Sequence, residues 1–179
     1  MRSSSWFLIP FLACHIAGAQ ALSKAETRDA TAAVAATLDD WHLAAAQGDE
    51  GRYFGRMAPE AVFVGTDPDE RWTKEEFRQW AHPGFAAHRI WVFKALRRNI
   101  ALSPSGDVAW FDEALDTNSM GKARGSGVLR KEGGSWLITQ YVLSLPIPRA
   151  VFREVRQMIT LLESPSKKTQ GEAPTPGGK

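Results

Sequence analysis

The sequence predicts an α+β fold in which N-terminal helices pack on a curved antiparallel sheet of about four to six strands. In the first half of the chain, apolar residues recur at three- and four-residue steps, the period of an amphipathic helix. Between residues 90 and 145, strand-like segments alternate with short turn signals, which indicates antiparallel neighbours. A curved sheet wrapped around a long helix leaves a cone-shaped cavity that suits a small ligand.

The first helix is predicted over residues 23–47 and ends at Gly48. Its apolar stripe consists of Val34, Leu38, Trp41 and Ala45. Asp49 is placed to cap a second, short helix that carries Met57 and ends at Pro59.

A short strand is predicted next, over residues 61–64, and it leads into a polar turn at residues 65–69. Thr73 and Glu76 have the spacing of a capping box, in which each side chain satisfies a free backbone amide at the start of a helix. The third helix therefore begins there, and Pro83 followed by glycine is expected to end it.

Four strands are predicted in the second half, at residues 90–102, 108–117, 122–131 and 135–145. Residues 151–162 return to a helical period, and this lone amphipathic helix is expected to pack on the domain or on a partner subunit. The last residues are rich in Pro, Gly, Lys, Ser and Thr, which predicts a disordered tail. The predicted organisation is a leader at 1–21, one domain at 22–148, a terminal helix at 149–163 and the tail at 164–179.

The leader has the composition of a secretory signal peptide. Arg2 supplies a positive charge, residues 6–13 form a short apolar run, and residues 17–21 offer the small side chains that signal peptidase reads. The run is too short to span a membrane. We therefore expect an exported protein, periplasmic or secreted.

Cys14 is the only cysteine, and it lies inside the leader. A chain cleaved after Ala19 or Ala21 has no thiol for a disulfide, a metal site or a nucleophile. The alternative is a lipoprotein anchored through Cys14, because residues 11–14 resemble a bacterial lipobox.

Charge and motifs exclude several classes of protein. The formal net charge of +2 gives no electrostatic case for nucleic acid, nor for a membrane unless Cys14 is lipidated. Phosphate loops, dinucleotide fingerprints, nucleophile elbows and metal-ligand spacings are not found in the sequence. We expect neither a cofactor nor a metal.

Several segments, taken in order, resemble the SnoaL-like branch of the nuclear-transport-factor-two-like superfamily over roughly residues 27–148. The segments are Trp41-His42, residues 64–73 (VGTDPDERWT), 109–113 (AWFDE), 124–129 (RGSGVL) and 136–141 (WLITQY). The resemblance implies a cone-like α+β barrel, often a homodimer through the outer face of its sheet. It leaves the function open, because the superfamily includes isomerase-, dehydratase- and cyclase-like enzymes as well as non-catalytic binding modules.

Three residues are candidates for acid–base chemistry. Asp67 lies near the place where isomerase-like members of the superfamily carry a general base, although Asp before Pro is also ordinary turn chemistry. His42 is either a base or donor in the cavity or a half-buried structural histidine. Tyr141 is either an oxyanion donor or a core aromatic residue.

Glu113 shares a strand face with apolar residues, so its carboxylate needs a partner. Arg124 on the next strand is the expected partner, in a structural ion pair or a site for an anionic ligand. Arg98 belongs to a basic cluster that we expect to be solvated. The remaining ligand-binding candidates are Trp41, Phe63, Thr66 and Trp80, since aromatic walls suit a flat ligand and equally suit a large core.

The leading hypothesis is an exported homodimer that binds a small, mostly apolar molecule in its cavity. The first alternative is a cofactor-free proton-transfer enzyme of the isomerase, dehydratase or cyclase type. The second alternative is a non-catalytic interaction module whose cavity is filled by side chains.

Overall fold

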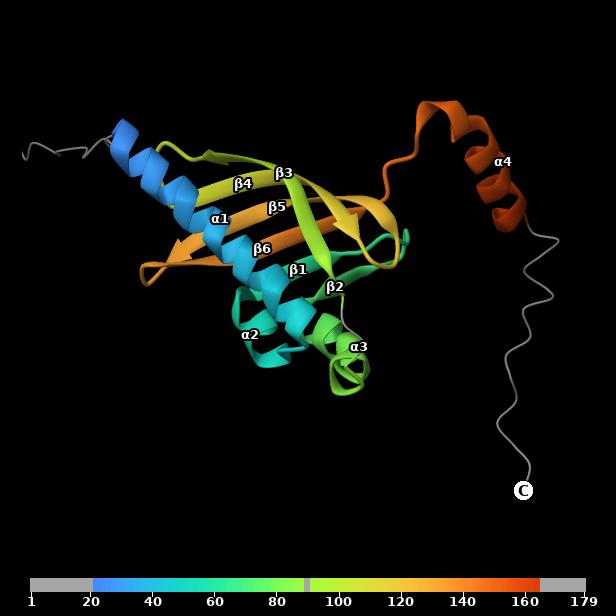
Figure 1. Cartoon of the computed structure of the whole chain (residues 1–179), viewed down its shortest axis with the longest axis horizontal. Helices are drawn as coiled ribbons and strands as arrows, with labels where there is room; N and C mark the ends of the chain where they lie inside the picture. The colour runs from blue at the N-terminus through green and yellow to red at the C-terminus, as the bar shows by residue number, and fades with distance from the viewer. Residues whose placement is uncertain (1–20, 89–90, 165–179) are drawn as a thin grey trace, which may run out of the picture.

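The computed structural model describes residues 21–88 and 91–164 of the 179-residue chain. It confirms the α+β fold: helices come first, and a curved sheet that stays open follows (Figure 1). The helical elements are α1 (Lys24–Gln47), α2 (Glu50–Gly55), α3 (Lys74–Ala86), the 3-10 turn η1 (Arg149–Val151) and α4 (Phe152–Glu163). The strands are β1 (Met57–Val64), β2 (Arg71–Thr73), β3 (Phe93–Leu102), β4 (Val108–Thr117), β5 (Gly121–Glu132) and β6 (Ser135–Ser144).

The sheet has the order β2-β1-β6-β5-β4-β3. Strands β3 to β6 form the predicted antiparallel meander, and β1 pairs antiparallel with the short strand β2. The pairing of β1 with β6 is parallel, so the sheet is mixed rather than wholly antiparallel. The sequence analysis expected antiparallel pairing because a short turn forces it between the two strands that it joins. No such turn joins β1 to β6.

Helix α1 lies across one face of the sheet and supplies the centre of the core (Figure 1). The predicted apolar stripe of the helix is buried. Ser23 and Glu26 form a capping box at the start of the helix. Gly48 ends the helix with a φ of 68°, a left-handed conformation that glycine adopts without strain. The face of the sheet under α1 is therefore the inner, core-forming face.

Two predicted helix ends were wrong, and both involve proline. Helix α2 already ends at Gly55, and Met57 begins β1, so Pro59 lies inside a strand. The pairing of β1 with β6 shifts register between Met57 and Val62, and such irregularities tolerate a residue without an N–H. Helix α3 also continues past Pro83 for a last turn that ends at Ala86.

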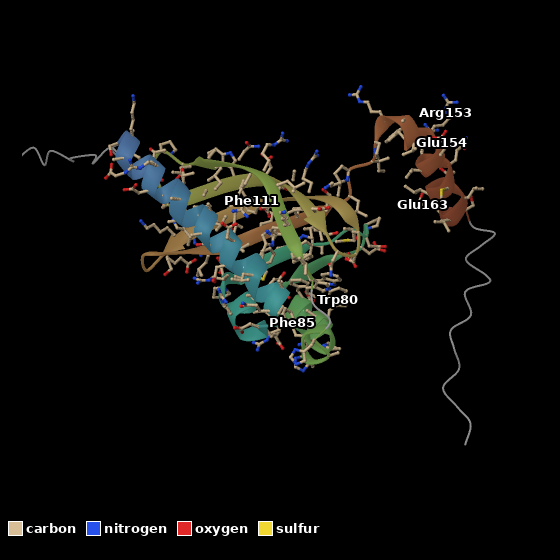
Figure 2. All side chains as sticks on the ribbon, in the orientation of Figure 1. Trp80, Phe85, Phe111, Arg153, Glu154 and Glu163 are labelled. Atoms are coloured by element: carbon tan, nitrogen blue, oxygen red, sulfur yellow. The ribbon has the colours of Figure 1, made fainter. Side chains whose placement is uncertain are left out.

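Helix α4 stands apart from the rest of the molecule. None of its residues is buried, so it does not pack on the domain. The labelled Arg153, Glu154 and Glu163 stand clear of the sheet and of α1 (Figure 2). Within the described residues, no helix is long and apolar enough to cross a membrane. The predicted signal peptide up to residue 20, Cys14 and the tail from residue 165 lie outside the described residues.

Candidate functional site

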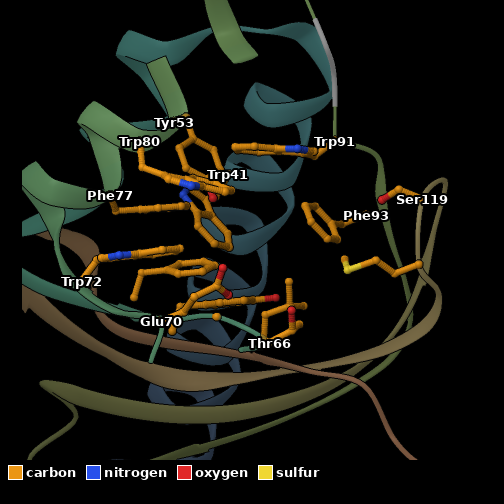
Figure 3. Close-up of a pocket in the computed structure, with 15 residues that line it drawn as sticks. Trp41, Tyr53, Thr66, Glu70, Trp72, Phe77, Trp80, Trp91, Phe93 and Ser119 are labelled. Carbon is orange, nitrogen blue, oxygen red and sulfur yellow. The ribbon is translucent and has the colours of Figure 1, made fainter. Parts of the chain in front are cut away.

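A cavity of about 290 Å³ opens between the helices and the inner face of the sheet. Every helix and strand that surrounds it contributes a ring, from Trp41 on α1 to Phe93 on β3. Nine of the fifteen residues that line it are aromatic (Figure 3). The aromatic side chains therefore form the wall of an open space rather than filling it.

Five of the rings share one orientation. The Phe63 and Phe77 centroids are 3.9 Å apart with planes 15° apart, and the Phe77 and Trp72 planes differ by 4°. The planes of Trp72 and Trp80 differ by 26°, and those of Trp80 and Trp91 by 19°. In Figure 3 the rings of Trp91, Phe77 and Trp72 are seen edge-on, parallel to one another. A flat molecule that enters in the same orientation can stack on these rings.

A network of charged and polar side chains lies behind this wall, centred on the fully buried Glu113 of β4. One carboxylate oxygen, Oε1, is 2.7 Å from Nε2 of His42 and accepts a 3.1 Å hydrogen bond from the Tyr141 hydroxyl. The other oxygen, Oε2, accepts a 2.8 Å hydrogen bond from Nε of Arg98. Nη1 of Arg98 continues the network to Asp39 at 2.8 Å. Glu113 therefore holds together α1, β3, β4 and β6.

These contacts fix the protonation of two groups in the network. Burial raises the pKa of Glu113, but the hydrogen bond and charge of His42, followed by the charge and hydrogen bond of Arg98, outweigh it and hold the pKa below 4.5. Burial, and then the charge of Glu113, raises the pKa of Tyr141 well above its ordinary value. Tyr141 therefore keeps its proton and directs it at Glu113.

Three buried polar atoms within the described residues have no hydrogen-bond partner: Trp41 Nε1, His42 Nδ1 and Arg98 Nη2. Because an ionised carboxylate only accepts, Nε2 of His42 carries the hydrogen that points at Glu113. Nδ1 on the other side of the ring is the atom left without a partner. Trp41 is different, because its N–H is a donor on a residue that lines the cavity.

Gly125 on β5 makes room for this network. It pairs with Glu113 in the sheet register, and it faces the same side. A Cβ built at this position would overlap the Tyr141 hydroxyl and would lie 2.9 Å from Oε1 of Glu113. Any side chain larger than that of glycine would therefore push the tyrosine or the carboxylate out of place.

Arg124 is not the partner of Glu113, which corrects the sequence-based expectation. In the register of the sheet, Glu113 lies between Arg98 on β3 and Gly125 on β5, whereas Arg124 pairs with Ala114. Alternation along the strand places Arg124 on the outer face, where it is exposed. The basic residue expected to be solvated, Arg98, has a side chain only 10% exposed and makes the ion pair instead.

The structure brings five of the predicted site residues together at the cavity. They are Trp41, Phe63, Thr66, Trp80 and Tyr141. His42 and Glu113 lie outside the lining: Glu113 contacts the lining residue Tyr141, and the His42 ring packs against Trp41 and Phe93. Asp67 is exposed on the turn after β1, where its Oδ1 accepts a 3.1 Å hydrogen bond from the Asp69 amide. That bond is the turn chemistry considered as its alternative role.

Glu70 is the carboxylate that lines the cavity, and the sequence interpretation missed it. It is half-buried, and Oε2 accepts a 3.1 Å hydrogen bond from the Asp67 amide. A Cβ at Gly65 would overlap the Glu70 carboxylate, so glycine lets the carboxylate pack against the chain. Glu70 directly precedes β2, whose three residues are too few to show an alternating pattern. The sequence therefore gave no signal for the direction of this side chain.

Within the described residues, no group of three His, Cys, Asp or Glu side chains is placed to hold a metal ion. The cavity lining has the same character, since Glu70 is its only carboxylate and none of its residues is Lys, Arg or His. Most of the lining is aromatic. Apart from the hydroxyls of its tyrosines, the polar side chains of the site are two hydroxyls and one carboxylate.

Known structures share the fold at low sequence identity. An NTF2-like protein of unknown function from Pseudomonas putida KT2440 superposes with a TM-score of 0.58 at 15% identity, covering 71% of this chain and 91% of that chain. A hexachlorocyclohexane dehydrochlorinase from Novosphingobium barchaimii superposes with a TM-score of 0.54 at 11% identity, covering 68% and 89%. No curated protein matches the sequence of this chain.

The family comparison covers most of the domain. The family model described as a SnoaL-like domain matches residues 34–148, from the middle of α1 to the end of the segment that follows β6. The match includes the cavity and the network around Glu113. This chain therefore belongs to the SnoaL-like domain family.

Proposed function

We propose that this chain binds a small, flat, largely apolar molecule in the aromatic cavity. The observation that carries the proposal is the open wall of nine aromatic residues, five of whose rings share one orientation. Its volume of about 290 Å³ lies near the lower end of the range for small-molecule sites. An interaction module with a filled cavity would not require this space.

Titration with naphthalene, followed by tryptophan fluorescence, tests the proposal. Trp80 lines the cavity and is 54% exposed, and Trp110 is 50% exposed on the outer face of the sheet. Trp80→Ala should weaken naphthalene binding about 2- to 10-fold, the effect of one lost aromatic contact, and Trp110→Ala should leave it unchanged. The proposal fails if naphthalene does not bind, or if both variants weaken it equally.

We also propose that the protein acts outside the cytosol. The support is the leader at residues 1–21, with its charge, apolar run and small residues. The mass and N-terminal sequence of the protein purified from its native host test this. A start after Ala19 or Ala21 supports cleavage and export, a lipid on Cys14 supports anchoring, and an intact Met1 contradicts both.

The second candidate function is cofactor-free proton transfer. It is favoured by Glu70, a carboxylate that lines an aromatic cavity. In this proposal Glu70 is the general base, the role that the sequence analysis considered for Asp67. The Tyr141 hydroxyl could serve as a donor only by releasing Glu113. The similar fold of a dehydrochlorinase is compatible with such chemistry without assigning it to this chain.

Hydrogen–deuterium exchange at the carbon beside the carbonyl of 2-tetralone, a flat ketone, tests the second candidate. The wild-type protein should accelerate the exchange, Glu70→Gln should abolish the acceleration, and Asp67→Asn should retain it. If the exchange is no faster than in buffer alone, proton transfer to or from this ketone is excluded as an activity. The binding proposal would remain intact.

A further inference from the structure

The charge of the cavity has one sign. Among the described residues that line it, Glu70 is the only carboxylate and none is Lys, Arg or His. Over the described residues, the single hydrogen bond to the Glu70 carboxylate comes from the Asp67 amide, and no ion pair involves it. The remaining acceptor capacity of the carboxylate is therefore open to a ligand.

Other carboxylates that are half-buried or buried in this fold are paired with cations. Three of them contact at least two cationic or ionisable side chains each, whereas Asp116 contacts Lys122 and Glu132 contacts Arg130. The three sets are Glu113 with Arg98 and His42, Asp40 with Arg52 and Arg56, and Glu50 with Arg78 and His82. Glu70 departs from this pattern, which indicates that its counter-charge comes from outside the chain.

The rest of the lining suits a cation. Four indole rings face the cavity, those of Trp41, Trp72, Trp80 and Trp91. Indole is the aromatic side chain that attracts cations most strongly, through the negative face of its ring. An anionic ligand would find donors in the buried Trp41 N–H and in the Thr66 and Ser119 hydroxyls, but it would also meet the unpaired carboxylate.

We infer that the cavity selects a flat aromatic molecule with a positive charge, such as an aryl ammonium or a ring with a quaternary nitrogen. Glu70 supplies the opposite charge, and the indole rings enclose the cation. The inference rests on the proposed binding function and names the class of ligand. Gly65 is part of the same arrangement, because its lack of a side chain leaves room for the carboxylate.

A pair of probes with the same shape and different charge tests the inference. N-Methylquinolinium is a flat cation, and 1-methylnaphthalene is its neutral counterpart with carbon in place of nitrogen. Each is titrated into the full chain, with binding followed by tryptophan fluorescence and by calorimetry. We expect the cation to bind about tenfold more tightly, the scale of a desolvated cation–aromatic contact beside a carboxylate.

Two variants locate the source of the preference. Glu70→Gln keeps the size of the side chain and should reduce the preference for the cation to the roughly two- to fivefold that the indole rings alone supply, without weakening 1-methylnaphthalene. Asp67→Asn removes the same charge from the same turn, but outside the cavity lining, and should keep the preference. The circular dichroism spectrum and thermal unfolding of both variants should match those of the wild type.

The outcomes separate this inference from the proposed function. Equal binding of the two probes by the wild type, or a preference that Glu70→Gln leaves undiminished, overturns the inference and leaves binding of a flat molecule intact. A preference lost equally in Asp67→Asn also overturns it, because the cause would then be the overall potential of the turn. If neither probe binds, the proposed function fails and the inference fails with it.

Discussion

Glu113 carries a negative charge in a place that excludes water, and its three partners compensate for the loss of solvation. Removing the charge leaves the Arg98 guanidinium, which is only 10% exposed, with Asp39 as its remaining counter-ion. Breaking a buried ion pair in this way costs about 3 to 5 kcal/mol. The network therefore stabilises the fold around the cavity, whatever the cavity binds.

Glu113→Gln should lower the free energy of unfolding at pH 7 by about 3 kcal/mol, measured by urea denaturation. The pKa of Glu113 in the folded protein is below 4.5, so ionisation stabilises the fold above that pH. This stabilisation is lost as the pH falls through the folded pKa. The difference between wild type and variant should therefore shrink towards pH 3.

Asp112→Asn is the matched control for this measurement. Asp112 neighbours Glu113, lies exposed on the outer face and accepts a 2.9 Å hydrogen bond from Asn99. Its substitution should change the stability by less than about 0.5 kcal/mol. If the difference in free energy of unfolding between wild type and Glu113→Gln stays constant with pH, ionisation of Glu113 does not contribute to stability.

Gly125→Ala should destabilise the protein by about 1 to 3 kcal/mol, because the added methyl group overlaps the Tyr141 hydroxyl. Gly55→Ala is the control, since a Cβ at Gly55 meets nothing within 4 Å and its φ is not positive. Thermal unfolding of the two variants measures the difference. Equal stabilities would mean that the network has space for a methyl group.

At this scale the sequence showed that Glu113 shares its strand face with apolar residues, but it left open whether Asp112 or Glu113 faces inward and did not identify the residue that Glu113 contacts. The shared face follows from alternation along one strand. The partner depends on register, and β3 contains an irregularity between Ala95 and Arg97 that changes which side each later residue faces. A single irregular residue of this kind determines whether Arg97 or Arg98 faces Glu113. No clear sequence pattern predicts where it occurs.

Among the elements, α4 contributes least to the domain. Its apolar residues are exposed, with Phe152 at 57% and Leu162 at 68%. A chain that ends at Pro148 should therefore keep its free energy of unfolding within about 0.5 kcal/mol, as for changes at an exposed surface. A larger loss on urea denaturation would indicate that α4 packs on the domain or on a second copy in solution.

The long elements could be predicted from the sequence because their patterns extend over many residues. Helix α1 shows its stripe over several turns, and the four strands of the meander are bounded by clear turn signals. Strand β2 and the start of β1 could not be predicted, because three residues show no period and Pro59 suggested a helix end. The carboxylate of the cavity was missed for the same reason, since it lies beside β2.

The outer face of the sheet lies opposite the face that α1 covers (Figure 1). Trp110 is half-exposed there, and the sheet register places Val128 and Gln140 in the same row. We propose that a second copy covers this face, in keeping with the expected homodimer. Burial of the tryptophan would then contribute about 2 kcal/mol to association.

Trp110→Glu should shift the protein from dimer to monomer in sedimentation velocity at micromolar concentration, because a carboxylate would be buried without a partner. Trp110→Phe should retain the dimer. A monomeric wild-type protein, or a glutamate variant that still dimerises, would exclude this face as the interface.

The parallel pairing of β1 with β6 has a consequence for the order of folding. Phe63 lies beside Tyr141, its partner 78 positions later in the chain, and both line the cavity. Contacts between such distant segments require a large loop to close, which is slow compared with the formation of a helix or a hairpin. During synthesis, α1, β1 and α3 leave the ribosome well before β6 is made. The cavity therefore cannot exist until the last strand has emerged, and a chain cut short before β6 has no binding site.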